Sequence, residues 1–176
     1  DAWVGLRSGI GGAVLSLAFS PSGALVAAGS FAGLAGGDLN NIAAWDGSVW
    51  GPLGTGTNGP VSAVAYLPSG AMIVGGNYAT AGSVAVSSIT GWNAGQWSAL
   101  GTGPTGEVDR LLALPDGSVI AAATITTDAN LGPSNIARWD GTAWTALGGG
   151  VGGPVVAMAL VPTGEWSAGG AFTSTG

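Results

Sequence analysis

VSAVAYLPSGAMIVGGNY, residues 61–78, is the stretch that decides the fold. Two apolar runs flank Pro68-Ser69-Gly70, where proline sets φ for a turn and glycine accepts a positive φ. Apolar runs on both sides of such a turn predict a β-hairpin. A loop of small residues follows, and Ser88–Trp92 then predicts a third strand.

A second hairpin completes the unit. The short connection Asn93–Gln96 leads from the third strand into a fourth, Trp97–Leu100. The corresponding connections elsewhere begin with Asp46-Gly47 and Asp140-Gly141, and Asp-Gly between two strands is a strong hairpin signal. The glycine-rich link Gly101–Gly106 then carries the chain onward, so each unit is predicted to hold four short strands.

The unit recurs every 47 residues without an insertion. Five classes of residue keep this interval: two sets of tryptophans, one set of leucines, and the proline and glycine of the turn. They are Trp3/Trp50/Trp97/Trp144, Trp45/Trp92/Trp139, Leu6/Leu53/Leu100/Leu147, Pro21/Pro68/Pro115/Pro162 and Gly23/Gly70/Gly117/Gly164. This regularity indicates a repeat architecture in which similar units pack side by side.

The first strand of each unit is apolar on both faces, as in Val14–Phe19, Leu111–Leu114 and Val155–Leu160. A strand with one face in water alternates polar and apolar residues, so these runs predict strands covered on both sides. Four-stranded units of this length, arranged radially, are typical of a β-propeller. We therefore predict an all-β fold, a β-propeller segment of four-stranded antiparallel blades with about 3.7 blades. A parallel β-helix is the structural alternative, although such a fold would not require two hairpins in each repeat.

The chain is predicted to be a single repeat domain over residues 1–176. It divides into a partial blade at 1–10, blades at approximately 11–56, 57–103 and 104–150, and a partial blade at 151–176. Because the blade shared by the two ends would lack its third strand, we expect the chain to belong to a longer protein. A partner chain that supplies the open edge and a closed four-bladed monomer are the alternatives, and we expect the isolated chain to associate.

The composition excludes several classes of function. The chain has no His, no Cys and no Lys, and 3 Arg stand against 9 Asp and Glu for a net charge of −6. It therefore lacks the residues of a Ser-His-Asp triad, a thiol nucleophile or the usual structural zinc site, and the basic footprint that nucleic acid requires. We predict no enzyme activity, no cofactor, no metal and no nucleic-acid partner. No apolar run is long enough for a transmembrane helix.

The run Ile73–Gly76 ends in a glycine pair, which Gly169-Gly170 repeats, and tryptophans follow in the later strands. This arrangement resembles the kelch type of propeller repeat. The fuller pattern at Asn135–Gly148, nearly repeated at Asn41–Gly54, resembles Gly-rich propeller repeats of large secreted or surface-exposed bacterial proteins. The resemblance implies a non-catalytic scaffold or protein-interaction module, extracellular or on the bacterial cell surface. Its partner would be another protein or a second copy, bound through open blade edges in a larger or oligomeric assembly.

A carbohydrate-binding propeller is the alternative function. Trp97–Gly101 is similar to the start of the repeats in tachylectin-like lectins, and tryptophan faces can stack on sugars in pockets between blades. The structural interpretation is aromatic packing across each short connection. The pairs concerned are Trp45/Trp50, Trp92/Trp97 and Trp139/Trp144. Trp166 belongs to neither of the two repeating sets of tryptophans, and we expect it to reflect ordinary sequence variation within a strand.

The carboxylates have structural and functional interpretations. Asp46 and Asp140 are predicted to accept hydrogen bonds from backbone N–H groups of their turns. Glu107, Asp109 and Arg110 form the one charge cluster, for which a local ion pair and a calcium or ligand site at Asp109 remain as alternatives.

Two loops contain patterns that occur in other binding sites. Gly36–Asn41 offers oxygen ligands, but it lacks the spacing of an EF-hand loop. Gly54–Gly59 matches Gly-x-Gly-x-x-Gly, but no helix follows it. This second pattern recurs in the later units, so we predict that it is the link between blades. The sequence assigns no catalytic, cofactor-binding or metal-binding residue, and it leaves the ligand-binding residues unassigned.

Overall fold

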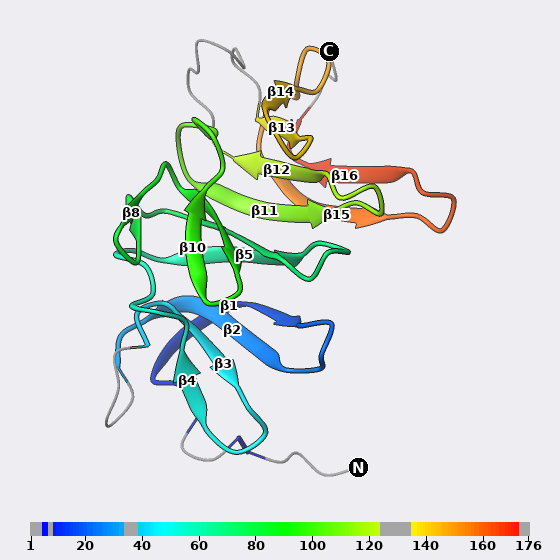
Figure 1. The fold of residues 1–176 in the computed structure, drawn as a ribbon. Coiled ribbons are helices and arrows are strands. Elements are labelled where there is room, and N and C mark those ends of the chain that lie inside the picture. The colour runs from blue at the N-terminus through cyan, green and yellow to red at the C-terminus, as the bar shows by residue number, and fades with distance from the viewer. Residues whose placement is uncertain (1–4, 7–8, 34–38, 124–134, 173–176) are drawn as a thin grey trace.

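The computed structural model describes residues 5–6, 9–33, 39–123 and 135–172, and the regular structure of these residues is entirely β (Figure 1). The strands in chain order are β1 (Gly12–Phe19), β2 (Leu25–Phe31), β3 (Ile42–Trp45), β4 (Trp50–Pro52), β5 (Val61–Tyr66), β6 (Met72–Gly76), β7 (Thr80–Ala81), β8 (Val84–Ala85), β9 (Ile89–Asn93), β10 (Gln96–Ala99), β11 (Val108–Ala113), β12 (Val119–Ala123), β13 (Ile136–Trp139), β14 (Trp144–Ala146), β15 (Val155–Leu160) and β16 (Trp166–Gly170). No segment of the described ranges forms a helix that could cross a membrane.

Three four-stranded antiparallel sheets contain most of these strands. The first sheet has the order β1-β2-β3-β4, the second β5-β6-β9-β10 and the third β11-β12-β13-β14. β15 and β16 form a two-stranded fourth sheet. β5, β11 and β15 begin 47 residues apart, at Val61, Val108 and Val155, so the sheets repeat at the interval of the sequence.

The predicted turns are confirmed. Gly23, Gly70, Gly117 and Gly164 follow the first strand of each sheet, and their φ angles are 87°, 87°, 86° and 89°. A side chain is strained in this left-handed region, which explains why glycine holds the position in every unit. The loop of small residues predicted between the second and third strands of the second sheet contains a short hairpin, β7–β8, which the sequence analysis missed.

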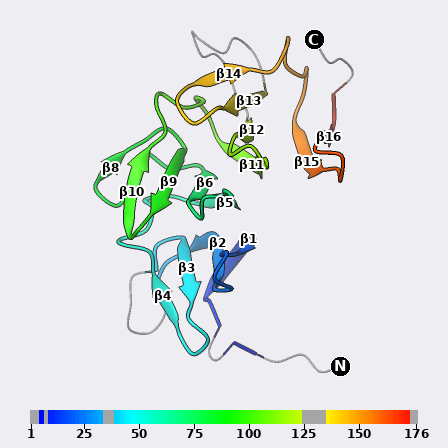
Figure 2. The same ribbon diagram turned by 45° about the vertical axis from the view of Figure 1, so that its right-hand side comes forward.

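The sheets follow one another along an arc. β5 lies between β1 and β11, and β11 also contacts β15 (Figure 1). The fourth strands of the four-stranded sheets lie at their opposite edges. Figure 2 shows that β1 lies at one end of the arc and that β15 and β16 lie at the other.

The hydrophobic core lies between consecutive sheets. Val26 and Ile42 of the first sheet meet Val61 and Met72 of the second. A comparable cluster joins the second and third sheets, and another joins the third and fourth. Each sheet after the first therefore buries one apolar face against the sheet before it.

The first strand of every sheet carries a β-bulge at the same place. The register shifts between Val14 and Ser16, and again at the equivalent points of β5, β11 and β15. A bulge adds one unpaired residue and reverses which side chains share a face. Val14 therefore lies on the same face as Leu17 and Phe19. This reversal is one reason why the apolar run reads as unbroken in the sequence.

The prediction that every first strand is covered on both sides is wrong for β1 and β15. Val14, Leu15, Leu17 and Phe19 of β1 are 42, 56, 62 and 70 % exposed. Val156 of β15 is also exposed. The physical reason is that covering requires a neighbour on each side, and only the sheets at β5 and β11 have described sheets on both sides.

Candidate interaction surface

Four apolar side chains of β1 form the candidate site. We call Val14, Leu15, Leu17 and Phe19 the β1 flank. Val14, Leu17 and Phe19 lie on the face of the first sheet opposite to Val26, which packs against the second sheet. Leu15 is the extra residue of the bulge. A contiguous exposed apolar patch of this kind marks an interaction site more often than scattered exposed side chains do.

The equivalents of Val14 and Leu17 in the second and third sheets pack into the core between sheets. Val61 and Val108 take the place of Val14 in the second and third sheets, and both are 0 % exposed. Val64 and Leu111 take the place of Leu17, and each packs into the core formed with the preceding sheet. Val14 and Leu17 therefore lie on the face that every later sheet packs against the sheet before it.

The fourth sheet exposes a face of a different kind at the other end of the arc. Ala157, Ala159, Ser167 and Gly169 are exposed there, and Gly169 has no atom within 4 Å of the position that a Cβ would occupy. The equivalent Gly75 of the second sheet faces Val108, whose Cγ1 would lie 2.5 Å from such a Cβ. The exposed face of the fourth sheet is thus a flat surface of small residues.

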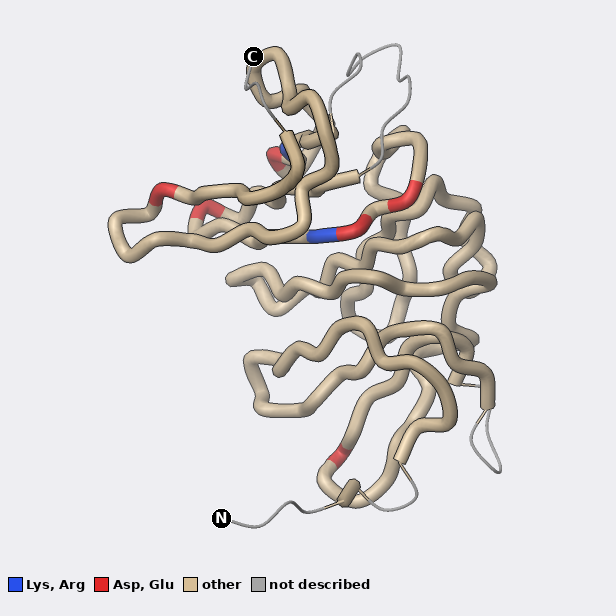
Figure 3. Tube along the Cα trace, turned by 180° about the vertical axis from the view of Figure 1, so that it is seen from behind, with Lys and Arg blue, Asp and Glu red and all other residues tan. Residues whose placement is uncertain are grey.

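Charge is absent from both of these faces. Strands β1, β2, β15 and β16 contain no Asp, Glu, Lys or Arg. Asp46 is the one charged residue among the described residues of the first two sheets, and the others gather on and beside the third and fourth (Figure 3). A partner that covers either end face would not have to desolvate an ion.

The charge cluster predicted at the start of the third unit joins three sheets. Glu107 Oε1 accepts a hydrogen bond of 3.3 Å from Ser62 Oγ of the second sheet. Arg110 Nε donates to the carbonyl oxygen of Val156 in the fourth sheet at 2.9 Å, and its Nη1 donates to the Asp109 carbonyl at 2.7 Å. These contacts were not visible in the sequence because their partners come from other repeats. No group of three acidic residues in the described ranges is placed to hold a metal ion.

The tryptophan pairs pack across their hairpins as the structural interpretation predicted. The ring centroids are 5.5 Å apart in Trp45/Trp50, 4.6 Å in Trp92/Trp97 and 5.5 Å in Trp139/Trp144. Trp92 and Trp139 belong to the cores between sheets, and Trp144 Nε1 donates to the Leu100 carbonyl at 2.7 Å. Trp166 packs against the third sheet, in the position that Met72 and Val119 take elsewhere.

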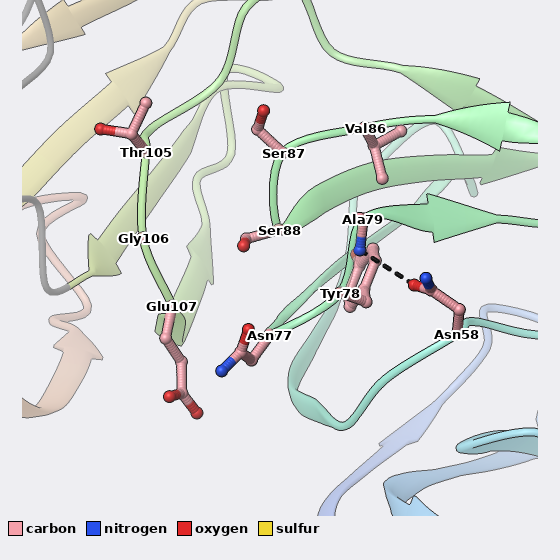
Figure 4. A pocket seen from close by; sticks show the side chains of 10 residues that line it. All are labelled: Asn58, Asn77, Tyr78, Ala79, Val86, Ser87, Ser88, Thr105, Gly106 and Glu107. Atoms are coloured by element: carbon pink, nitrogen blue, oxygen red, sulfur yellow. Dashed lines mark hydrogen bonds between the residues drawn. The ribbon is translucent and has the colours of Figure 1, made fainter.

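A polar recess of about 640 Å³ opens between the loops of the second and third sheets (Figure 4). It is lined by Asn58, Asn77, Tyr78, Ala79, Val86, Ser87, Ser88, Thr105, Gly106 and Glu107. Asn58 Oδ1 accepts hydrogen bonds from the backbone N–H groups of Ala79 and Thr80, each at 2.9 Å. Burial raises the pKa of Tyr78, whose hydroxyl donates to the Val74 carbonyl.

A smaller recess of about 370 Å³ lies between the first and second sheets. Asn40, Asn41 and Asn58 line it, and Asn41 Nδ2 donates to the Thr57 carbonyl at 3.0 Å. Neither recess is lined by a tryptophan, so the sugar-stacking platform of the alternative function is not at these two places. Periodicity did not reveal the recesses because the equivalents of Asn58 are Gly11, Thr105 and Gly152, so no asparagine recurs at this position.

The two loop patterns differ in their place in the fold, since Asn40 and Asn41 precede β3 of the first sheet and Gly54–Gly59 follows its last strand. Gly36–Asp38 lie outside the described residues, whereas Asn40 Nδ2 donates to the Thr55 carbonyl at 2.9 Å. Gly54–Gly59 connects β4 to β5, which confirms it as the link between sheets.

The acids of the hairpin turns act as predicted. Asp46 Oδ1 accepts from the backbone N–H groups of Ser48 and Val49 at 2.7 and 2.8 Å. Asp140 Oδ1 accepts from those of Thr142 and Ala143 at 2.8 and 2.9 Å. These hydrogen bonds, first that from Ala143, lower the pKa of Asp140 from 3.8 to about 2.

The stability contribution of Asp140 is expected to depend on pH. Since the folded state lowers the pKa, the contribution is present above about pH 4 and is lost as the pH falls toward the folded pKa of about 2. Titration of the Asp140 carboxyl carbon by NMR should give a midpoint near the lower value, and Asp140→Asn should remove this pH-dependent component from thermal unfolding. A midpoint at the ordinary value would contradict the turn's hydrogen bonds.

No protein-family model matches the chain, and no curated protein is significantly similar to it. The likeness to kelch repeats therefore depends on the sequence pattern alone.

Proposed function

We propose that this chain is a segment of β-propeller repeats that acts as a non-catalytic scaffold or protein-interaction module in an extracellular or bacterial surface assembly. The β1 flank is the observation that carries the proposal. Its four side chains are exposed, whereas the same positions in the second and third sheets include valines with no exposed surface. An apolar surface of this form is expected to be covered by protein.

The radial arrangement is supported by which strands are neighbours. The first strands of successive sheets contact one another along the inside of the arc, and the fourth strands do not take part in that contact. Val64 N also donates to Ser16 Oγ at 3.2 Å, a bond that joins the first strands of two sheets. Four-stranded sheets that meet through their first strands are typical of propeller blades.

The non-catalytic role is supported by the bonding of the turn acids. Asp46 and Asp140 each accept three hydrogen bonds within their own turn, and Asp116 accepts from Ser118 and pairs with Arg138. Carboxylates bonded in this way stabilise loops. With no His or Cys in the chain, the usual nucleophile and base pairs are missing as well.

The proposal is tested by association in solution. Sedimentation velocity across the micromolar range should show association of the wild-type chain, weakened by about tenfold or more in Leu17→Glu because a charge would be buried without a partner. Val49→Glu is the matched control, since Val49 is also exposed and apolar but lies in the hairpin turn between β3 and β4. A wild-type chain that stays monomeric, or equal loss in both variants, would contradict the proposal.

A further inference from the structure

The contacts between sheets within the chain follow one rule. A valine at the start of each first strand packs on a small residue in the second strand of the preceding sheet. Val61 and Ala28 share the core between the first and second sheets, and Val155 and Ala122 share the core between the third and fourth. Between these two, Val108 lies directly against Gly75.

At each end of the arc, one side of this contact is exposed. Val14 is the equivalent of Val61 and Val108, and it is exposed on the β1 flank. Gly169 is the equivalent of Gly75, and nothing occupies the space above it. The first sheet thus offers the valine side of the contact, and the fourth sheet offers the small-residue side.

We infer that the β1 flank of one copy packs on the exposed face of the fourth sheet of a second copy, with Val14 over Gly169. This inference rests on the proposed interaction function and names its partner. The contact repeats the packing seen between sheets inside the chain, and neither surface carries a charge that would have to be desolvated. Within one copy the two surfaces lie at opposite ends of the arc, with β5 and β11 between them (Figure 2).

The geometry of this contact determines the kind of assembly. The two surfaces differ, so the interface is heterologous, and each copy that binds through one surface still offers the other. Association therefore continues beyond a dimer unless the rotation closes a ring. Flank-to-flank association would instead be isologous and stop at two copies.

Cross-linking tests the pairing, because the chain contains no cysteine of its own. A Val14→Cys copy and a Gly169→Cys copy, distinguished by mass, are mixed and oxidised, and the mixed disulfide is expected to exceed either homodimer several-fold. Gly75→Cys with Val108→Cys in one chain is the positive control, because that pair already lies in contact.

A second measurement protects the test against an unfavourable disulfide geometry. Gly169→Leu fills the receiving surface and should weaken association by about tenfold or more, while leaving the monomer folded. Predominant disulfides between two Val14→Cys copies would overturn the inference in favour of flank-to-flank contact. An intramolecular disulfide in a chain that carries both Val14→Cys and Gly169→Cys would overturn it in favour of closure within one chain. Association of Gly169→Leu at the strength of the wild-type chain would also overturn the inference. If Leu17→Glu still prevented association in that case, the proposed function would stand, and the β1 flank would bind a surface other than the exposed face of the fourth sheet.

Discussion

Replacing Gly75 by leucine is expected to lower the free energy of unfolding by about 3 kcal/mol. Gly75 lies where the second sheet meets the third. A Cβ at this position would lie 2.5 Å from Cγ1 of Val108 and 3.3 Å from Cδ1 of Leu111, so the remaining atoms of a leucine have no space. Val108 is fully buried and cannot move aside without separating the two sheets. Denaturant unfolding followed by tryptophan fluorescence gives the loss.

Gly169→Leu is the matched control for this prediction. The two glycines are equivalent positions of the repeat, but an added Cβ at Gly169 meets no atom within 4 Å. In dilute protein the control is expected to change the free energy of unfolding by less than about 0.5 kcal/mol. Equal losses at both positions would mean that the strand needs glycine for its backbone conformation, and would contradict the packing explanation.

Much of the fold could be predicted because the repeat fixes positions at which the backbone tolerates few residues. Gly70 and its equivalents have positive φ angles, so the turn is visible in the sequence at every unit. Asp140 could be placed in its turn for a similar reason, since its carboxylate bonds only to groups within three residues. Structure that depends on residues close together in the chain can therefore be predicted from short sequence motifs.

The candidate site could not be predicted because it depends on which neighbours a strand has. Val14–Phe19 and the corresponding run from Val61 are both apolar, but one strand lies at the end of the arc and the other between two sheets. Periodicity shows which face of a strand is apolar. It carries no information on whether a neighbouring sheet covers that face. The recess at Asn58 was not predicted for a related reason, since its lining comes from segments that are far apart in the sequence.

The β-bulge explains why the pattern of the first strands was misread. An unbroken apolar run usually means that both faces are covered. In β1 the extra residue Leu15 shifts the alternation by one, so Val14 and Leu17 share a face although three positions separate them. Apolar residues at both parities thus arise partly from the bulge and only partly from double-sided burial.

Alanine substitutions at the four equivalent valines are expected to separate buried from exposed positions in the dilute monomer. Val61→Ala and Val108→Ala should each lower the free energy of unfolding by about 2 kcal/mol, because the lost methyl groups leave a cavity between two sheets. Val155 is 5 % exposed and should behave similarly. Val14 is 42 % exposed, and Val14→Ala should cost less than about 0.5 kcal/mol.

The cost of Val14→Ala is expected to rise once the protein associates. A second copy that covers the β1 flank places Val14 in the environment that Val61 already has, so the same deletion then removes a buried contact. Denaturant unfolding at low and high protein concentration measures the change, and Val61→Ala, buried at both, serves as the reference. If Val14→Ala had the same small effect in the associated protein, Val14 would not occupy the central, fully packed place in the interface that the proposed contact over Gly169 gives it.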